Sequence, residues 1–186
     1  MGKTPSRGAL FSAGGAAGLL FALLFAGTAQ AGCSSSRVPA TIKTDTTYDG
    51  TYYINQDTLV DSNATLTLKA GTELVFCGNY HLRIGPNSAY PAATLKAEGK
   101  PGSPVVMRAK DPNTNWRGLQ LRNVRTDTEL HYMEIRDSGG NKPSSYRGAL
   151  YMRFQKSQDQ PDAVIDHVTI ENSGGLGVRW KKANSD

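Results

Sequence analysis

The sequence predicts an all-β solenoid, in which short strands coil around an apolar core and each coil stacks on the one before it. Two observations predict this fold. Residues 130–140, LHYMEIRDSGG, return thirty-five residues later as residues 165–175, IDHVTIENSGG, and a repeat of that period is typical of solenoids. After residue 31, apolar residues alternate with period two and do not fall at helical spacing, so we expect almost no helix.

Residues 1–31 have the layout of a secretory signal peptide. A positively charged start precedes an apolar stretch from about Ala9 to Ala26, and small residues ending at Ala31 make a cleavage site. A membrane anchor is the alternative, but the Leu/Phe core from Leu19 to Phe25 is shorter than the roughly 20 residues that a span needs. We therefore expect cleavage, no remaining transmembrane span, and an exported protein that is periplasmic, secreted or at the cell surface.

Cleavage leaves 155 residues (186 minus 31), enough for one domain with a core. It removes two of the 21 Lys and Arg residues and none of the 16 acids, so the net charge falls from +5 to +3 (19 minus 16). No basic cluster with interleaved aromatic residues remains. Nucleic-acid binding is therefore not expected.

The two cysteines, Cys33 and Cys77, leave three interpretations open. Ala31-Gly32-Cys33 resembles the end of a lipoprotein signal and would make Cys33 a lipidation site, although Gln30 stands where that pattern has Leu. An exported pair can instead form a disulfide. Two unrelated thiols are the third interpretation, whereas metal binding by two such distant cysteines is not expected.

Residues 32–50 are rich in Ser and Thr and lack periodicity, so we expect a flexible or N-terminal capping arm ahead of a solenoid domain at 51–186. Coils are predicted at about 51–80, 81–115, 116–146 and 147–175, with a further coil begun at Leu176. An early strand of each coil places two apolar residues inward. These inward pairs are Leu82/Ile84, Leu119/Leu121, Leu150/Met152 and Leu176/Val178.

Four segments carry a resemblance: AGTELVF (70–76), ATLKAEGKPGSPVVMRA (93–109), NWRGLQLRN (115–123) and ELHYMEIRDSGG (129–140). They resemble the recurring blocks of right-handed parallel β-helix proteins of the pectate-lyase-like superfamily, common in exported bacterial proteins. The resemblance covers about residues 51–180 and implies a right-handed parallel β-helix of about four to five coils. It is specific for the fold and not for the function, because relatives include polysaccharide lyases, hydrolases, adhesion modules and proteins without known activity.

A solenoid needs a cover over each open end, and enzymes of the superfamily usually have more coils than this chain. The resemblance therefore implies either a β-helix truncated at its C-terminus or a last coil covered by a partner or by a second copy of the chain. Lys181, Lys182 and Asp186 are charges of the kind that blunt an exposed strand edge.

Arg122, Arg153 and Arg179 each follow an inward pair, so we expect them to point outward in a ladder. Such a ladder implies either flanking carboxylates or an anionic ligand such as a uronate polymer; three solvated arginines that splay apart are the other interpretation. Trp180 could stack on a sugar ring of that ligand or plug the end of the solenoid. Lyases of the superfamily place Arg and Lys on the outside of a sheet to neutralise a substrate carboxylate and remove the neighbouring proton.

No catalytic residue or metal ligand is predicted. Stacked acids hold Ca²⁺ in lyases of the superfamily, but Asp137 aligns with Asn172 in the repeat, so it and Glu171 are better explained as turn residues. The histidines have no serine or carboxylate at the spacing of a triad or a metal site, so we expect them to be structural or surface residues. No cofactor is expected, and Ca²⁺ enters only if the protein is a lyase.

The sequence thus predicts an exported or cell-surface module, non-catalytic, that binds carbohydrate or another surface component through one sheet face. A polysaccharide lyase acting on a uronate-containing polymer is the first alternative. A structural or incomplete segment of a longer β-helix protein is the second.

Overall fold

The computed structural model describes residues 32–61, 63–86, 92–139, 148–154 and 163–182. Within these ranges the chain forms strands and no helix, and every pairing between the strands is parallel. The six-stranded sheet has the order β1 (Thr41–Ile42), β4 (Thr58–Val60), β7 (Leu82–Ile84), β10 (Leu119–Arg122), β12 (Leu150–Phe154), β14 (Val178–Lys182). The eight-stranded sheet has the order β2 (Thr46–Tyr48), β5 (Thr65–Lys69), β8 (Thr94–Glu98), β11 (Glu129–Arg136), β9 (Val105–Ala109), β6 (Glu73–Phe76), β3 (Thr51–Ile54), and β13 (Val164–Glu171) also pairs with β11.

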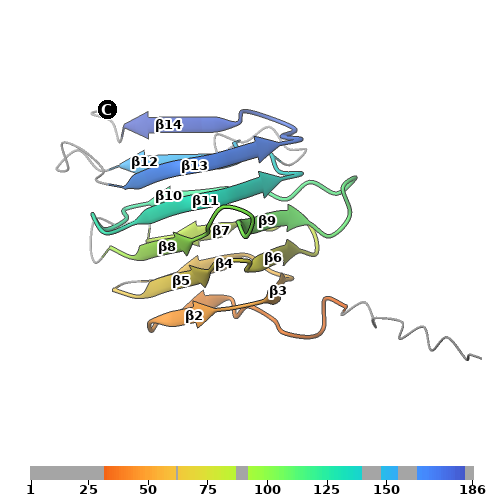
Figure 1. The fold of residues 1–186 in the computed structure, drawn as a ribbon, viewed down its shortest axis with the longest axis horizontal. Helices are drawn as coiled ribbons and strands as arrows, with labels where there is room; N and C mark the ends of the chain where they lie inside the picture. Colours follow the sequence, from red (N-terminus) through yellow and green to blue (C-terminus); the bar gives the residue numbers. More distant parts are fainter. Residues whose placement is uncertain (1–31, 62, 87–91, 140–147, 155–162, 183–186) are drawn as a thin grey trace, which may run out of the picture. The chain divides into compact units, whose positions relative to one another are not determined.

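The strands follow one another around the two sheets as coils. Each coil begins in the six-stranded sheet and continues in the eight-stranded sheet, so β1–β3, β4–β6, β7–β9, β10–β11 and β12–β13 make five coils and β14 begins a sixth. Figure 1 shows the coils stacked in sequence order from β2 to β14. The prediction of an all-β, parallel solenoid is confirmed.

The first coil lies earlier in the chain than the sequence predicted. β1 and β2 fall within residues 32–50, where we expected an arm, and they pair with β4 and β5. Strands of two and three residues are too short to show a period-two alternation. Ahead of them, Val38 is buried in the core and its nitrogen donates to the oxygen of Tyr53 at 2.9 Å, so this part of the arm packs along β3.

Alternation along the strands fills one apolar core. Three of the predicted inward pairs are buried and stack in register: Leu82/Ile84, Leu119/Leu121 and Leu150/Met152. In the eight-stranded sheet, Leu74, Met107 and Ile135 form a similar column. Each column removes apolar area from water, and this burial stabilises the fold by about 25 cal/mol for each Å² of apolar area.

The predicted inward pair of the last strand is wrong by two residues. Val178 pairs with Leu150 and Trp180 pairs with Met152, so the inward pair is Val178/Trp180 and not Leu176/Val178. A shift of two residues keeps every side chain on the same face, so the alternation could not reveal it.

The corner before the strand sets this register. The sequence offers two glycines, Gly175 and Gly177, each followed by an apolar residue. The structure uses the second one: the nitrogen of Leu150 donates to the oxygen of Gly177 at 3.0 Å, and that of Ala149 donates to the oxygen of Leu176 at 2.9 Å.

Other corners are also built from stacked side chains. Asp137 and Asn172 have φ values of 53° and 51°, and Nδ2 of Asn172 donates to Oδ1 of Asp137 at 3.3 Å, so the interpretation of Asp137 as a turn residue is confirmed. Trp116 stacks on Phe76 with ring centroids 3.8 Å apart, and its Nε1 donates to the oxygen of Arg136 at 2.8 Å. These contacts hold successive coils in place at their bends.

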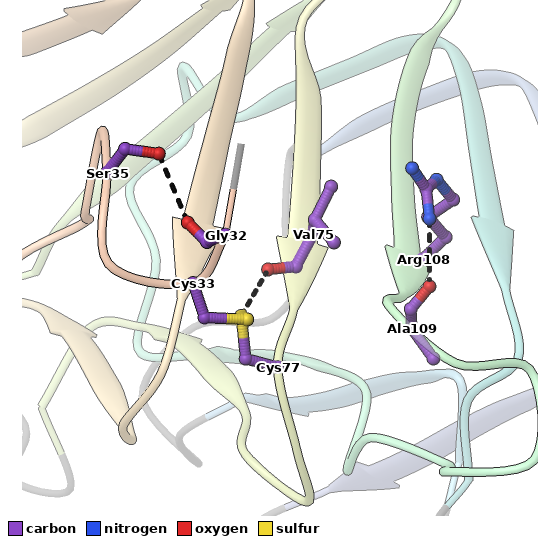
Figure 2. Close-up of a disulfide and its surroundings, with 7 residues drawn as sticks. All are labelled: Gly32, Cys33, Ser35, Val75, Cys77, Arg108 and Ala109. Carbon is purple, nitrogen blue, oxygen red and sulfur yellow. Dashed lines mark hydrogen bonds between the residues drawn. A yellow bond between two sulfur atoms is a disulfide. The ribbon is translucent and has the colours of Figure 1, made fainter. Parts of the chain in front are cut away.

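Cys33 and Cys77 form a disulfide, with their Cα atoms 6.1 Å apart (Figure 2). It joins the segment ahead of β1 to the residue that follows β6, 44 positions later in the sequence. Of the three interpretations that the sequence left open, the structure has the disulfide. A sulfur atom bonded in this way cannot also carry a lipid.

The predicted signal peptide, residues 1–31, lies outside the described residues, and so do residues 183–186. Cleavage after Ala31 therefore stays a prediction. In the part of the chain that the structure describes, no helix is long and apolar enough to cross a membrane.

Candidate ligand-binding face

Two columns of side chains stand on the outer face of the six-stranded sheet, because they alternate with its inward apolar residues. One column holds Arg83, Gln120, Tyr151 and Arg179, and the other holds Arg122, Arg153 and Lys181. Paired residues on neighbouring strands lie about 4.8 Å apart. We call the five basic residues of the two columns the cationic face: Arg83, Arg122, Arg153, Arg179 and Lys181.

The predicted arginine ladder is correct in its first two members and wrong in its third. Arg122 pairs with Arg153, but Arg153 pairs with Lys181. Arg179 belongs to the other column, beside Tyr151, because of the two-residue shift in β14. The same shift of two residues kept Lys181 out of the predicted ladder.

Arg83 is the second residue that the sequence argument missed. It stands between the inward residues Leu82 and Ile84, so alternation alone places it on the outer face. Its Nε is buried and has no hydrogen-bond partner among the described residues.

Trp180 lies on the inner side of β14, in register with Met152, and is 60% exposed. Its side chain therefore continues a column of the core and does not stand beside Arg179 on the outer face. Of the two predicted roles, the position agrees with the end of the solenoid and not with stacking on a ligand of the cationic face.

The basic residues of the two sheets differ in whether they form ion pairs. On the eight-stranded sheet, Nζ of Lys69 lies 2.7 Å from Oε2 of Glu98, and Nε of Arg136 lies 3.3 Å from Oε2 of Glu171. The strands of the six-stranded sheet contain no Asp or Glu. Within the described ranges, no ion pair joins a carboxylate to Arg83, Arg153, Arg179 or Lys181.

Accessibility varies across the cationic face. Arg122 is buried, with its guanidinium carbon 5.4 Å from the ring centroid of Tyr151, which is also buried. Arg153 and Arg179 are half-buried, and Lys181 is exposed. A partner in solution therefore meets the last three residues, and Arg122 adds positive potential from a buried position.

His81 is mostly buried near several arginines. Its side chain is 13% exposed, and its Nδ1 lies 3.2 Å from Oδ1 of Asp57. Burial lowers the pKa of His81 to about 4; Asp57 opposes the shift, and the charges of Arg117, Arg83 and Arg122 add to it. The imidazole is therefore neutral at pH 7.

This shift predicts a loss of stability in mild acid. Between pH 6.5, the ordinary pKa of His81, and about 4, the unfolded chain binds a proton that the folded chain does not. The free energy of unfolding should therefore fall as the pH falls, by at most about 1.4 kcal/mol per pH unit from this residue. Urea unfolding at pH 7.5 and pH 5 measures the effect, and the His81→Asn variant should lose less stability over the same interval. Equal losses in the two proteins would contradict the assignment.

A separate hollow of about 360 Å³ lies beside the bend in β11 and β13. Tyr132 and His167, which the repeat aligns, have φ values of 43° and 52°, and their rings stack with centroids 4.3 Å apart. Lys100 and Glu134 also line the hollow, and Glu134 forms an ion pair with Arg136. His167 thus stabilises the bend by stacking, the structural role that we expected for the histidines.

The acids singled out in the sequence have other partners. Asp137 serves in a turn. The prediction of a turn residue is wrong for Glu171, which is the last residue of β13 and pairs with Arg136 of the neighbouring strand. Among the described residues, no group of three or more His, Cys, Asp or Glu side chains is placed to hold a metal ion.

Comparison of the chain with protein-family models, with curated proteins and with solved structures finds no match in any of the three. The resemblance to the pectate-lyase-like superfamily therefore rests on its sequence blocks. The architecture supports the coarser statement, a parallel β-solenoid. Any function must be argued from the faces of that solenoid.

Proposed function

We propose that this chain is an exported binding module that holds an anionic polysaccharide on its cationic face. One observation carries the proposal: Arg153 and Lys181 stand in register on strands without acids, while Lys69 and Arg136 of the opposite sheet pair with carboxylates. Like charges in register repel one another. An anion laid across them relieves the repulsion and gains charge-assisted hydrogen bonds.

The regularity of the face favours a polymer over a single small anion. The columns repeat at the spacing of the strands, about 4.8 Å, and a chain of uronate units likewise presents its carboxylates at regular intervals. Arg153 and Arg179 supply planar guanidinium groups, which bind carboxylates through two parallel hydrogen bonds. Several weak contacts along one polymer then add to a useful affinity.

Two features support an extracytoplasmic location for this binding. The first 31 residues have the layout of a signal peptide. The disulfide between Cys33 and Cys77 is of a kind that persists in oxidising compartments. Acidic polysaccharides of cell surfaces and of the surrounding medium are ligands that an exported protein meets.

Charge reversal on the cationic face tests the proposal. Lys181→Glu and Arg153→Glu should each weaken binding to an acidic polysaccharide about tenfold, because each replaces an attraction by a repulsion. Lys96→Glu is the matched control: it makes the same change of charge on the outer face of β8, in the other sheet, and should change the affinity less than about twofold. Binding to immobilised polyuronate at 50 and 300 mM salt measures all three.

Equal effects of the Lys181 and Lys96 substitutions would contradict the proposal, since they would show attraction by net charge alone. Retention on a neutral glycan that is insensitive to the Arg153 substitution would place the carbohydrate elsewhere on the protein.

A further inference from the structure

The last two strands, β13 and β14, and the corner between them expose apolar side chains that the rest of the solenoid buries. Among the described residues, the large apolar side chains with high exposure all come from this segment and have exposed fractions of 42% to 60%. They are Val164, Ile165, Leu176, Val178 and Trp180. In the first coil the inward residues Ile42 and Ile54 are buried, with exposed fractions of 3% and 0%.

Three of the exposed side chains continue columns of the core. Ile165 stands in register with Leu130, Val178 with Leu150, and Trp180 with Met152, and these three partners are buried. The exposed surface is therefore a layer of core positions, and not a scatter of single apolar residues of the kind that protein surfaces tolerate.

The two strands of this layer are also edge strands, whose backbone N–H and C=O groups can pair with a further strand. In the described part of the solenoid, β13 pairs only with β11 and β14 pairs only with β12. The inward residues of β14 are apolar, Val178 and Trp180, and its basic residues discourage pairing with another basic edge but not with an acidic one. This edge is suited to pairing with further strands.

We infer that a second copy of this chain docks on this layer through a two-fold axis, with β14 of each copy running antiparallel along β13 of the other. Figure 1 shows β13 and β14 pointing in opposite directions, so a half-turn about an axis along the strands exchanges the two sheets and makes both new pairings antiparallel. Such an interface is closed: each copy covers the other's apolar layer and both edges, and no edge is left for a third copy.

The charges on β13 and β14 favour this arrangement over the second possible one, in which the two-fold axis is perpendicular to the strands. The outer side of β14 carries Arg179 and Lys181, and the outer side of β13 carries Asp166 and Glu171. The crossed pairing sets the basic edge of one copy beside the acidic edge of the other. An axis perpendicular to the strands would instead set β14 against β14 and β13 against β13, with like charges adjacent, which is destabilising.

Sedimentation equilibrium tests the inference on the full chain, expressed in a secreting host and purified from the exported fraction. The chain should form a dimer with a dissociation constant of about 10 μM or tighter. Trp180→Glu should raise that constant at least about 100-fold, because it places a charge at the centre of the apolar layer. Circular dichroism checks that the variant stays folded.

Asp166→Lys tests the crossed geometry without touching the apolar layer, and should weaken the dimer about tenfold. Adding Lys181→Asp to that variant should restore the dissociation constant to within about threefold of the original, because the opposite charges again meet across the interface. A monomeric wild-type chain at about 100 μM, a dimer insensitive to Trp180→Glu, or a double variant as weak as Asp166→Lys would each overturn the inference.

The inference and the proposed function share Lys181, but Trp180→Glu and Arg153→Glu each change only one of them and so separate the two statements. A monomeric Trp180→Glu protein that still binds acidic polysaccharide supports both statements, because binding then depends on the cationic face alone. A dimer that ignores every polysaccharide would overturn the proposed function and leave the docking inference intact.

Discussion

Replacing Gly85 by alanine should lower the free energy of unfolding by about 3 kcal/mol, because it breaks the contact between two coils. Gly85 follows β7 with a φ of +84°, a conformation that alanine rarely adopts. A Cβ at this position would lie 1.8 Å from the backbone oxygen of Arg122 in the next coil. Since a backbone oxygen cannot rotate away, the coils must separate locally. Urea unfolding measures the loss.

Gly50→Ala provides the matched control. Gly50 has a φ of +95°, but a Cβ there would meet nothing within 4 Å, so this substitution should cost only the backbone strain, about 1 kcal/mol. Equal losses at the two positions would show that Gly85 is needed only for its backbone conformation and that the coils do not approach as closely as described.

Replacing Cys33 and Cys77 together by serine should lower the free energy of unfolding by about 3 kcal/mol. The disulfide closes a loop between residues 44 positions apart, which restricts the unfolded chain and holds the arm against the second coil. For a domain of this size the melting temperature should fall by about 10 °C. Calorimetry of the variant and of the oxidised wild-type chain measures the difference.

The reduced wild-type chain is the control for this experiment. It should melt close to the serine variant, because both lack the covalent link. A wild-type chain whose melting temperature does not respond to reductant, or whose mass shows a lipid on Cys33, would contradict the disulfide. A lipid on Cys33 would also support the lipoprotein interpretation.

The fold could be predicted from the sequence because its signals are periodic. The repeat between residues 130–140 and 165–175 appears in the structure as β11 paired with β13, and the alternation in each strand separates the core from the surface. β1 and β2 were missed because so few residues cannot display a period. Their place follows from pairing with β4 and β5, which is a long-range property.

The candidate site was only partly predictable, for two physical reasons. Arg122 and Arg153 were placed correctly because their strands share one spacing, but a two-residue shift at Gly177 exchanged Arg179 for Lys181. Alternation cannot detect such a shift. The burial of Arg122 beside Tyr151 depends on what packs over the sheet, and the pattern within a strand carries no signal for it.

Incubating the exported chain with a panel of polyuronates and neutral glycans, while following both retention and the ultraviolet absorbance of unsaturated uronate, tests most directly whether the cationic face binds without cleaving. We expect saturable retention on an acidic polymer, weakened by Arg153→Glu, with flat absorbance. Rising absorbance would contradict a binding module and identify a polysaccharide lyase, with Arg153 beside Lys181 as its first candidate site. Absence of retention on every acidic polymer, by a chain shown to be folded, would contradict the proposed function outright.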